Sequence, residues 1–252
     1  MAVSLRKMCS ALGLTGRVSI CQDLLGFTES KMPAAVVATR PKPTLNLNRF
    51  AQLLKGQHFH VRLIVAGSDL LSANDGAVID YAVFRLRDIY SAAGIGVGRV
   101  TWDMRAAASS AGHATVNTSD DLDQTGHDLT ADGDFVPVVI PANMNVSTIN
   151  PDGSVFVVYG RSPTPPGPCS PRTGAGMRSS VIDIVGEETG RTLAHEVGHY
   201  LGAKHPSPAD NSLMTQTGSV TSGNAFSAVS INAADKTTML GHCTIRPGLP
   251  GI

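Results

Sequence analysis

The sequence predicts an α/β (α+β) fold, and three segments carry that prediction. Residues 58–66 are rich in β-branched and aromatic side chains and stop at Gly67, which is typical of a strand. Residues 77–93 carry a broad apolar face at helical spacing and are followed by Gly94, a common helix terminator. Residues 97–104 form a second strand-like run. Strand, helix and strand in this order predict a parallel βαβ unit.

The rest of the body is punctuated by turns and prolines. Residues 105–134 are rich in polar residues, so we expect irregular structure there. Asn-Pro-Asp-Gly at 150–153 is a turn sequence and predicts a hairpin between strands at 145–149 and 154–159. The other expected elements are a strand at 135–140, a proline-rich loop at 161–173, a short strand at 180–185, a helix at about 189–201, and a helix at about 231–240 with Ser230 or Asn232 as its N-cap.

Charge divides the chain into an N-terminal extension and a body. The 252 residues are 42% hydrophobic, which suffices for one sizeable core. Residues 1–55 hold eight basic and two acidic residues, a net charge of +6, and the remainder carries −6. We therefore expect residues 1–48 to be a basic extension, a propeptide or a linker, which the acidic body at 49–252 attracts. The zero total charge does not favour a nucleic-acid partner, and no apolar run is long enough for a transmembrane helix.

The strongest chemical pattern lies between His195 and His205. His195 and His199 are four residues apart, so a helix places both imidazoles on one face, one turn apart. Glu196 lies beside them and can serve a metal-activated water as general base. Gly202 can adopt the backbone angles that end a helix, which lets His205 return as a third ligand. Three protein ligands leave one position open, as in catalytic rather than structural zinc sites.

The full pattern HExxHxxGxxH is far more specific than HExxH alone. With this chain's own residue frequencies it arises by chance in roughly one of 10⁵ such chains. Its helix also carries an apolar stripe of Leu193, Val197 and Leu201, which predicts that one side faces the core. The alternative is three histidines that merely line the end of a helix.

This pattern resembles the zinc-binding motif of the metzincin metallopeptidases. That family has a methionine-containing turn after the third histidine, and Ser212-Leu213-Met214-Thr215 matches it. Some branches place a tyrosine two residues after this methionine. Gln216 stands there, so the chain is most similar to the reprolysin and matrixin branches. The resemblance covers residues 57–245. It implies one Zn²⁺, a protein or peptide substrate, Met214 as an apolar floor beneath the ligands, and a twisted, mostly parallel sheet with an antiparallel edge strand, an active-site helix and a C-terminal helix.

The resemblance also implies a mechanism of peptide hydrolysis. The zinc ion would activate a water molecule, and Glu196 would pass its proton to the leaving amine. Extended substrate would pair with the edge strand, for which residues 154–159 are the candidate and an ordinary hairpin strand is the alternative. Residues 217–226 would shape the pocket beyond the scissile bond. Two other classes of function remain open: a binding module of this fold without turnover, and a zinc hydrolase of a non-peptide amide.

Four cysteines neither demand nor exclude disulfides. Reprolysin-like relatives join regions similar to those of Cys169 and Cys243, so this pair is a candidate disulfide, with two free thiols as the alternative. If it forms, it favours a secreted or extracytoplasmic protein, although the chain start is a poor signal peptide. In the extension, the thiolate of Cys9 or Cys21, or the carboxylate of Asp23, is a candidate zinc-blocking group. Neither cysteine lies in the matrixin propeptide pattern.

A weaker metal hypothesis concerns the acidic residues between 120 and 134. Carboxylate oxygens suit Ca²⁺, which many metzincins bind, but the spacing matches no calcium loop, so a solvated loop is the simpler interpretation. His113 and His127 lie nearby in the sequence and are candidates for a second metal site. The acidic residues are Asp120, Asp121, Asp123, Asp128, Asp132 and Asp134.

Overall fold

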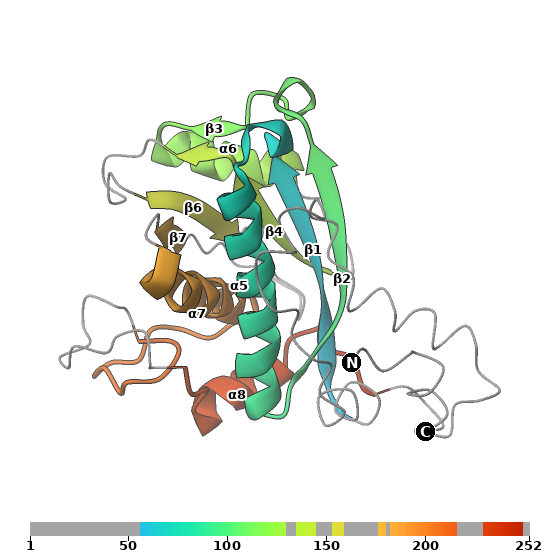
Figure 1. Cartoon of the computed structure of the whole chain (residues 1–252). Coiled ribbons are helices and arrows are strands. Elements are labelled where there is room, and N and C mark those ends of the chain that lie inside the picture. Colours follow the sequence, from blue (N-terminus) through green and yellow to red (C-terminus); the bar gives the residue numbers. More distant parts are fainter. Residues whose placement is uncertain are drawn as a thin grey trace, which may run out of the picture.

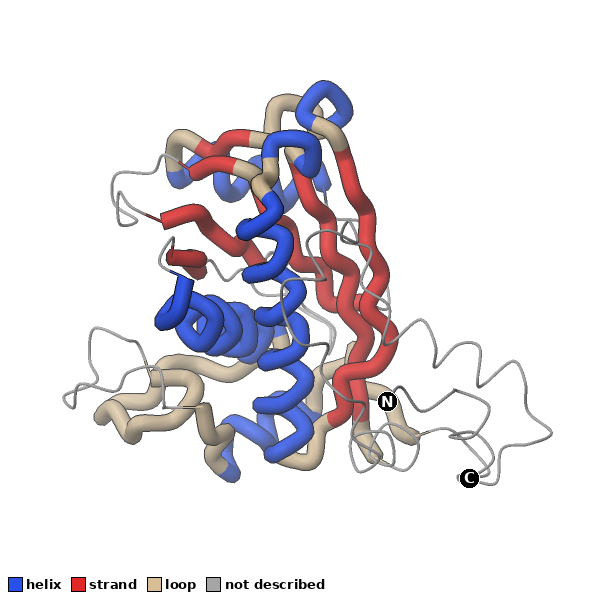
Figure 2. The backbone as a smooth tube through the Cα atoms, viewed as in Figure 1, coloured by secondary structure: helices blue, strands red, loops and turns tan. Residues whose placement is uncertain are grey.

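A five-stranded sheet with two long helices packed against one face forms the body of the molecule (Figures 1 and 2). The computed structural model describes residues 56–129, 135–144, 153–158, 176–179, 182–215 and 229–248. The sheet has the order β2-β1-β4-β6-β7. Its strands are β1 (His58–Ala66), β2 (Gly96–Arg105), β4 (Phe135–Pro141), β6 (Gly153–Val158) and β7 (Gly176–Ser179).

β6 is the one strand of this five-stranded sheet that runs against the others. β1 pairs in parallel with β2 and β4, whereas β6 runs antiparallel to β4 and β7 runs antiparallel to β6. A second, two-stranded sheet joins β3 (Thr115–Val116) and β5 (Asn143–Met144) in parallel. The helices are α5 (Ala73–Ala92), α6 (Ser119–Leu129), α7 (Ile182–Tyr200) and α8 (Ala233–Leu240), and short 3₁₀ turns cover Ser68–Leu70 and Ala107–Ser109. The fold is of the α/β class.

The predicted βαβ unit is present as β1, α5 and β2. The strand prediction at 58–66 is confirmed, and the others differ by a few residues at their ends. α5 begins at Ala73, four residues earlier than predicted, because Ser72 and Asp75 form a reciprocal capping box. The helix stops before Gly94, whose φ of +78° favours glycine.

The core lies between the sheet and the pair α5 and α7. Alternate β1 residues (Phe59, Val61, Leu63 and Val65) are fully buried against the helices, and each buried apolar side chain stabilises the fold by ~1.5–3 kcal/mol. The phenol of Tyr90 on α5 donates a 3.0 Å hydrogen bond to the Ala194 carbonyl of α7. This bond fixes the two helices against one another, and burial raises the pKa of Tyr90.

The prediction of irregular structure throughout 105–134 is wrong. α6 lies in this segment, and β3 precedes it. The Thr118 hydroxyl accepts from the Asp121 amide at 3.0 Å, and the Asp121 carboxylate accepts from the Thr118 amide at 3.1 Å. This reciprocal cap starts a helix within a run that has few apolar residues.

The predicted strand at 180–185 is also wrong, because α7 already begins at Ile182. β-branched residues at 182, 184 and 185 favour a strand locally, but the helix continues from them into the motif. Gly190 lies inside α7 where α5 crosses it: a Cβ there would lie 2.5 Å from that of Arg85. A strand does form just before, at Gly176–Ser179.

The predicted strand at 154–159 is present as β6, shifted by one residue. Its predicted hairpin partner, residues 145–149, lies outside the described residues, and within the described residues β6 pairs with β4 and β7. The predicted edge strand, residues 154–159, is therefore an inner strand, because β7 covers it at 153–156. The loop at 161–173 and the extension at 1–48 also lie outside the described residues.

The C-terminal part returns to the start of the sheet. α8 is capped by Asn232, whose side chain accepts from the Asp235 amide, so one of the two predicted caps is confirmed. Beyond α8, Arg246 pairs with His58 through backbone hydrogen bonds of 2.9 and 2.7 Å. No helix in the described part of the chain is long and apolar enough to span a membrane.

Candidate metal centre

α7 carries His195, Glu196 and His199 and ends at Tyr200, before the third histidine of the motif. The Ala203 amide donates to the Gly198 carbonyl at 3.0 Å, and the Gly202 amide donates to the His199 carbonyl at 2.9 Å. These are the two bonds of a Schellman motif, which needs a left-handed residue at the position of Gly202. Gly202 has φ +99°. The chain turns back there and brings His205 to the two helical histidines, as predicted.

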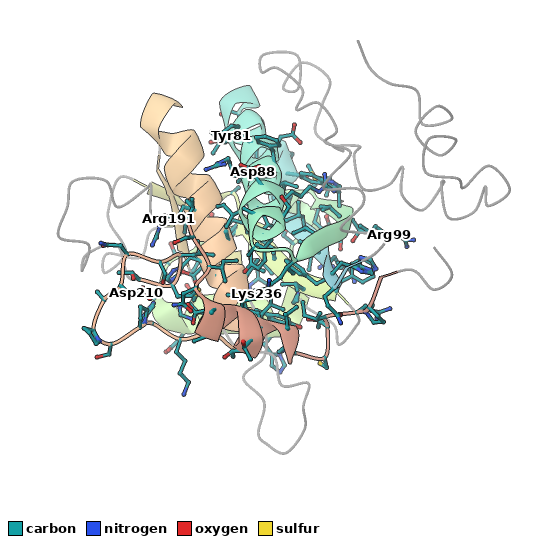
Figure 3. The ribbon with its side chains drawn as sticks, turned by 90° about the horizontal axis from the view of Figure 1, so that it is seen from below. Tyr81, Asp88, Arg99, Arg191, Asp210 and Lys236 are labelled. Carbon is teal, nitrogen blue, oxygen red and sulfur yellow. The ribbon has the colours of Figure 1, made fainter. Side chains whose placement is uncertain are left out.

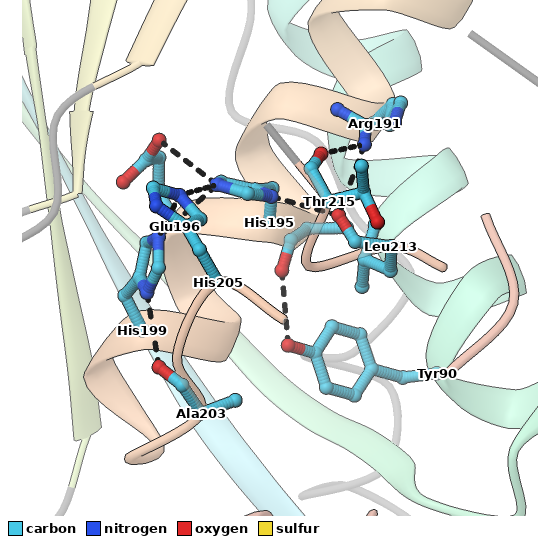
Figure 4. A network of polar contacts seen from close by, with 10 residues as sticks. Tyr90, Arg191, His195, Glu196, His199, Ala203, His205, Leu213 and Thr215 are labelled. Carbon is cyan, nitrogen blue, oxygen red and sulfur yellow. Dashed lines mark hydrogen bonds and ion pairs between the residues drawn. The ribbon is translucent and has the colours of Figure 1, made fainter. Parts of the chain in front are cut away.

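The Nε2 atoms of the three histidines converge (Figure 4). His195 and His199 are 3.1 Å apart at these atoms, His195 and His205 3.1 Å, and His199 and His205 3.0 Å. Among the residues described, this is the one group of His, Cys, Asp or Glu side chains whose ligand atoms all lie within 4.8 Å of one another. His195 is buried, His199 half-buried and His205 exposed, so the site is open to solvent on the His205 side.

In His195 and His199, the hydrogen bond at Nδ1 determines which ring nitrogen carries the proton. His195 Nδ1 lies 2.7 Å from the Leu213 carbonyl, and His199 Nδ1 lies 3.0 Å from the Ala203 carbonyl. Because a carbonyl oxygen only accepts, both Nδ1 atoms carry the proton and both Nε2 atoms present a lone pair. Two lone pairs at 3.1 Å repel unless a cation lies between them. The donor set therefore fits a metal ion that prefers imidazole ligands.

The electrostatics of His195 agree with a ligand role. Burial, with a smaller contribution from the charges of His199 and Arg191, lowers the pKa of His195 to about 3, although the hydrogen bond to the Leu213 carbonyl opposes this shift. The ring is therefore neutral at pH 7, and a histidine must be neutral to bind a metal ion.

Glu196 lies beside the histidine cluster. Its side chain is 8% exposed, and Oε1 is 4.0 Å from His195 Nε2. Burial raises the pKa of Glu196, and the positive charge of Arg191 opposes that rise. A buried carboxyl next to three convergent imidazoles is suited to accept and release a proton at the reacting centre.

Met214 packs against α7, the helix that carries His195 and His199. It is fully buried, and a Cβ at Gly198 would lie 2.5 Å from its Sδ. Gly198 therefore leaves the space that Met214 fills, on the turn of α7 between His195 and His199. The stripe of Leu193, Val197 and Leu201 is fully buried as predicted.

Sequence reasoning missed Arg191. This residue lies one turn before His195 on α7 and is only 2% exposed. Its Nη2 donates to the carbonyls of Leu213 and Thr215, at 3.1 and 2.6 Å. The sequence signal that could have revealed Arg191 is a charged residue four positions before His195, on a helix that also carries the apolar stripe.

Replacing Gly202 by alanine tests the helix-ending turn. A Cβ there would meet only Thr238 Cγ2 at an ordinary 3.4 Å, so the cost comes from the positive φ. We expect Gly202→Ala to lower the free energy of unfolding by about 1–3 kcal/mol, measured by urea denaturation of the metal-free chain. Gly241→Ala is the matched control because Gly241 has φ −77°, and we expect a change within about 0.5 kcal/mol. Equal losses for both variants would contradict this account.

Asp210 joins the turn at residues 212–215, which contains Met214, to the start of α8 through hydrogen bonds. Its Oδ1 accepts from the Ser212 amide and the Thr215 hydroxyl, both at 3.0 Å. Its Oδ2 accepts from the Asn232 side chain at 2.9 Å. Figure 3 shows Asp210 on the loop before α8, and Arg191 on α7. Hydrogen bonds from Ser212, Asn232 and Thr215 lower the pKa of Asp210 to about 2.

The lowered pKa predicts how acid affects the stability of this loop. A carboxylate whose pKa is lower in the folded than in the unfolded chain stabilises the fold above about pH 4, and this contribution disappears as the pH falls through about 2. We expect Asp210→Asn to destabilise the metal-free chain at pH 7 by less than about 1 kcal/mol, since the site is exposed. The difference from wild type should shrink between pH 4 and pH 2 in urea denaturation. A difference that does not change with pH, or an equal one in the control Asp120→Asn, would disprove this prediction.

The secondary metal hypotheses gain no support from the described residues. His113 Nε2 and His127 Nδ1 contact opposite oxygens of Asp128, at 3.0 and 3.2 Å. Asp121 caps α6, and the described acidic residues form no three-ligand cluster. Asp132 and Asp134 lie outside the described residues.

The cysteine predictions are tested only at Cys243. This residue is disulfide-bonded, whereas Cys169, Cys9 and Cys21 lie outside the described residues, so the pairing stays a prediction. Asp23, Gln216 and the segment 217–226 lie outside the described residues too.

Comparison with known proteins adds no assignment to this centre. No family model matches the chain, and a search of the curated proteins finds no match. The chemistry of the centre is therefore inferred from its geometry and its sequence pattern.

Proposed function

We propose that the chain is a zinc-dependent endopeptidase of the metzincin type. The observation that carries this proposal is the convergence of three Nε2 atoms at 3.0–3.1 Å with the carboxyl of Glu196 beside them. A structural metal site has no use for a buried acid next to an open coordination position. A hydrolytic site needs both.

Zinc is the ion that this donor set favours. Three imidazoles without a thiolate or further carboxylate among the ligands match catalytic zinc sites that keep one position for water or substrate. When bound, such an ion supplies Lewis-acid chemistry, activating water and polarising a carbonyl group. His195, His199 and His205 would hold it, and two of them are already oriented by backbone carbonyls.

Glu196 would act as the general base and then as the proton donor. Its place next to the Nε2 cluster puts it within reach of the space that a reacting group would occupy. Low solvent exposure holds the carboxyl in position and strengthens its electrostatic interactions. Proton transfer by such a residue contributes about 10²–10⁴-fold to a hydrolysis rate.

Several structural features support the metzincin type. A mostly parallel sheet precedes the active-site helix, a buried Met214 follows the third histidine, and α8 comes last. β7 is the final strand of the sheet in the described part of the chain and runs antiparallel to its neighbour. We therefore assign the pairing with extended substrate to β7 instead of residues 154–159. The disulfide at Cys243 supports a location outside the reducing cytoplasm.

Digestion of a mixed peptide library by the zinc-loaded chain tests the proposal. We expect cleavage that a chelator abolishes and that added zinc restores. Zinc binding without cleavage would favour a binding module. Hydrolysis of a non-peptide amide panel by a chain inert toward peptides would favour the amide hydrolase.

The same assay on a chain lacking residues 1–48 tests the propeptide hypothesis, which predicts faster cleavage by the shorter form.

A further inference from the structure

We propose that Arg191 is a positioning residue of the metal centre, which holds the Leu213–Thr215 turn so that the Leu213 carbonyl orients His195. This inference rests on the proposed function, because it assigns a role in retaining the metal ion. It concerns a residue that neither binds the ion nor belongs to the motif.

One guanidinium nitrogen holds the turn on both sides of Met214. Arg191 Nη2 donates to the Leu213 carbonyl at 3.1 Å and to the Thr215 carbonyl at 2.6 Å. Met214 lies between these two residues, with its Sδ against Gly198 of α7. The guanidinium is buried, so the hydrogen bonds replace its lost hydration and have little competition from water.

The Leu213 carbonyl connects Arg191 to the ligand. The same oxygen that accepts from Arg191 also accepts from His195 Nδ1 at 2.7 Å. Its position determines which tautomer His195 adopts and therefore whether Nε2 is free for the metal. Arg191 and His195 lie one turn apart on α7, so the helix and the turn hold this carbonyl from two points.

Arg191 is not interchangeable with other cations here. A planar guanidinium can direct N–H groups toward two carbonyls on either side of a turn, whereas an ammonium is a shorter, point-like donor. Loss of an outer partner of a metal-binding histidine lowers metal affinity by about 10–100-fold. We expect Arg191→Met to release zinc 10–100-fold faster and Arg191→Lys to release it several-fold faster than the wild type.

The test compares zinc release from the full chain in three variants and the wild type. Zinc-loaded protein is mixed with a chromogenic chelator and the release rate is recorded, alongside the visible spectrum of the Co²⁺-substituted forms. Arg85→Met is the matched control, since Arg85 lies on α5 where it crosses α7 and pairs with Asp88. Thermal melting of the metal-free forms separates lost stability from lost positioning.

A positioning role predicts faster release and an altered Co²⁺ spectrum for both Arg191 variants, with wild-type release for Arg85→Met. Release rates within twofold of wild type for Arg191→Met and Arg191→Lys would overturn the role of Arg191 and leave the proposed function standing. If Arg191→Met does not fold, the release rate of Arg191→Lys decides the question. A wild-type chain that takes up no zinc would overturn the proposed function and this role with it.

Discussion

Glu196→Gln is expected to retain one zinc ion per chain and to lower the rate of peptide cleavage by about 10²–10⁴-fold. Glutamine has nearly the same shape and fills the same buried space, but its amide cannot take a proton from water at neutral pH. Glu196 is not among the three converging ligands, so metal content should not change. Metal analysis and cleavage assays on the same preparation measure both quantities.

The control for this substitution is Asp80→Asn, which removes a carboxylate from α5. It should cleave peptides at the wild-type rate. A zinc-loaded Glu196→Gln chain that retains cleavage within a few-fold of the wild type would remove Glu196 from the reaction. Loss of zinc along with activity would instead show that Glu196 acts on metal retention.

Zinc should raise the thermal stability of the chain by about 10 °C, and His205→Ala should lose most of that increase. Free zinc at a thousandfold excess over its dissociation constant stabilises a folded protein by about 4 kcal/mol, and 1 kcal/mol corresponds to about 2–4 °C at this chain length. His205 is exposed, so its removal leaves no core cavity and should change the metal-free melting temperature little.

Thermal melts with zinc and with chelator, for the wild type and His205→Ala, check this prediction. His127→Ala is the matched control, because its side chain is 60% exposed and lies on α6, in another part of the chain. It should keep the whole zinc-dependent increase. A full increase in His205→Ala would show that zinc binds elsewhere or needs only two ligands.

The geometry of the histidine cluster could be predicted from sequence because it depends on local rules. Helical periodicity places His195 and His199 on one face, and the left-handed position of Gly202 returns the chain. The β1 strand follows in the same way from its run of β-branched and aromatic residues, which ends at Gly67. Each of these features depends on neighbours within a few positions.

The features that could not be predicted depend on contacts that local patterns do not encode. Arg191 bonds to carbonyls 22 and 24 residues later in the chain. β7 takes the outer place in the sheet through pairing with β6. α6 is a different case, because its cap joins Thr118 and Asp121 only three residues apart and is visible in the sequence, but the predominance of polar residues in this run obscures the helix.

Zinc titration of the metal-free chain, with peptide cleavage recorded at each step, tests the central claim most directly. The account predicts that cleavage rises in proportion to added zinc and reaches its maximum at one ion per chain, with His195, His199 and His205 all required. Full zinc occupancy without cleavage of any peptide in the library would contradict it.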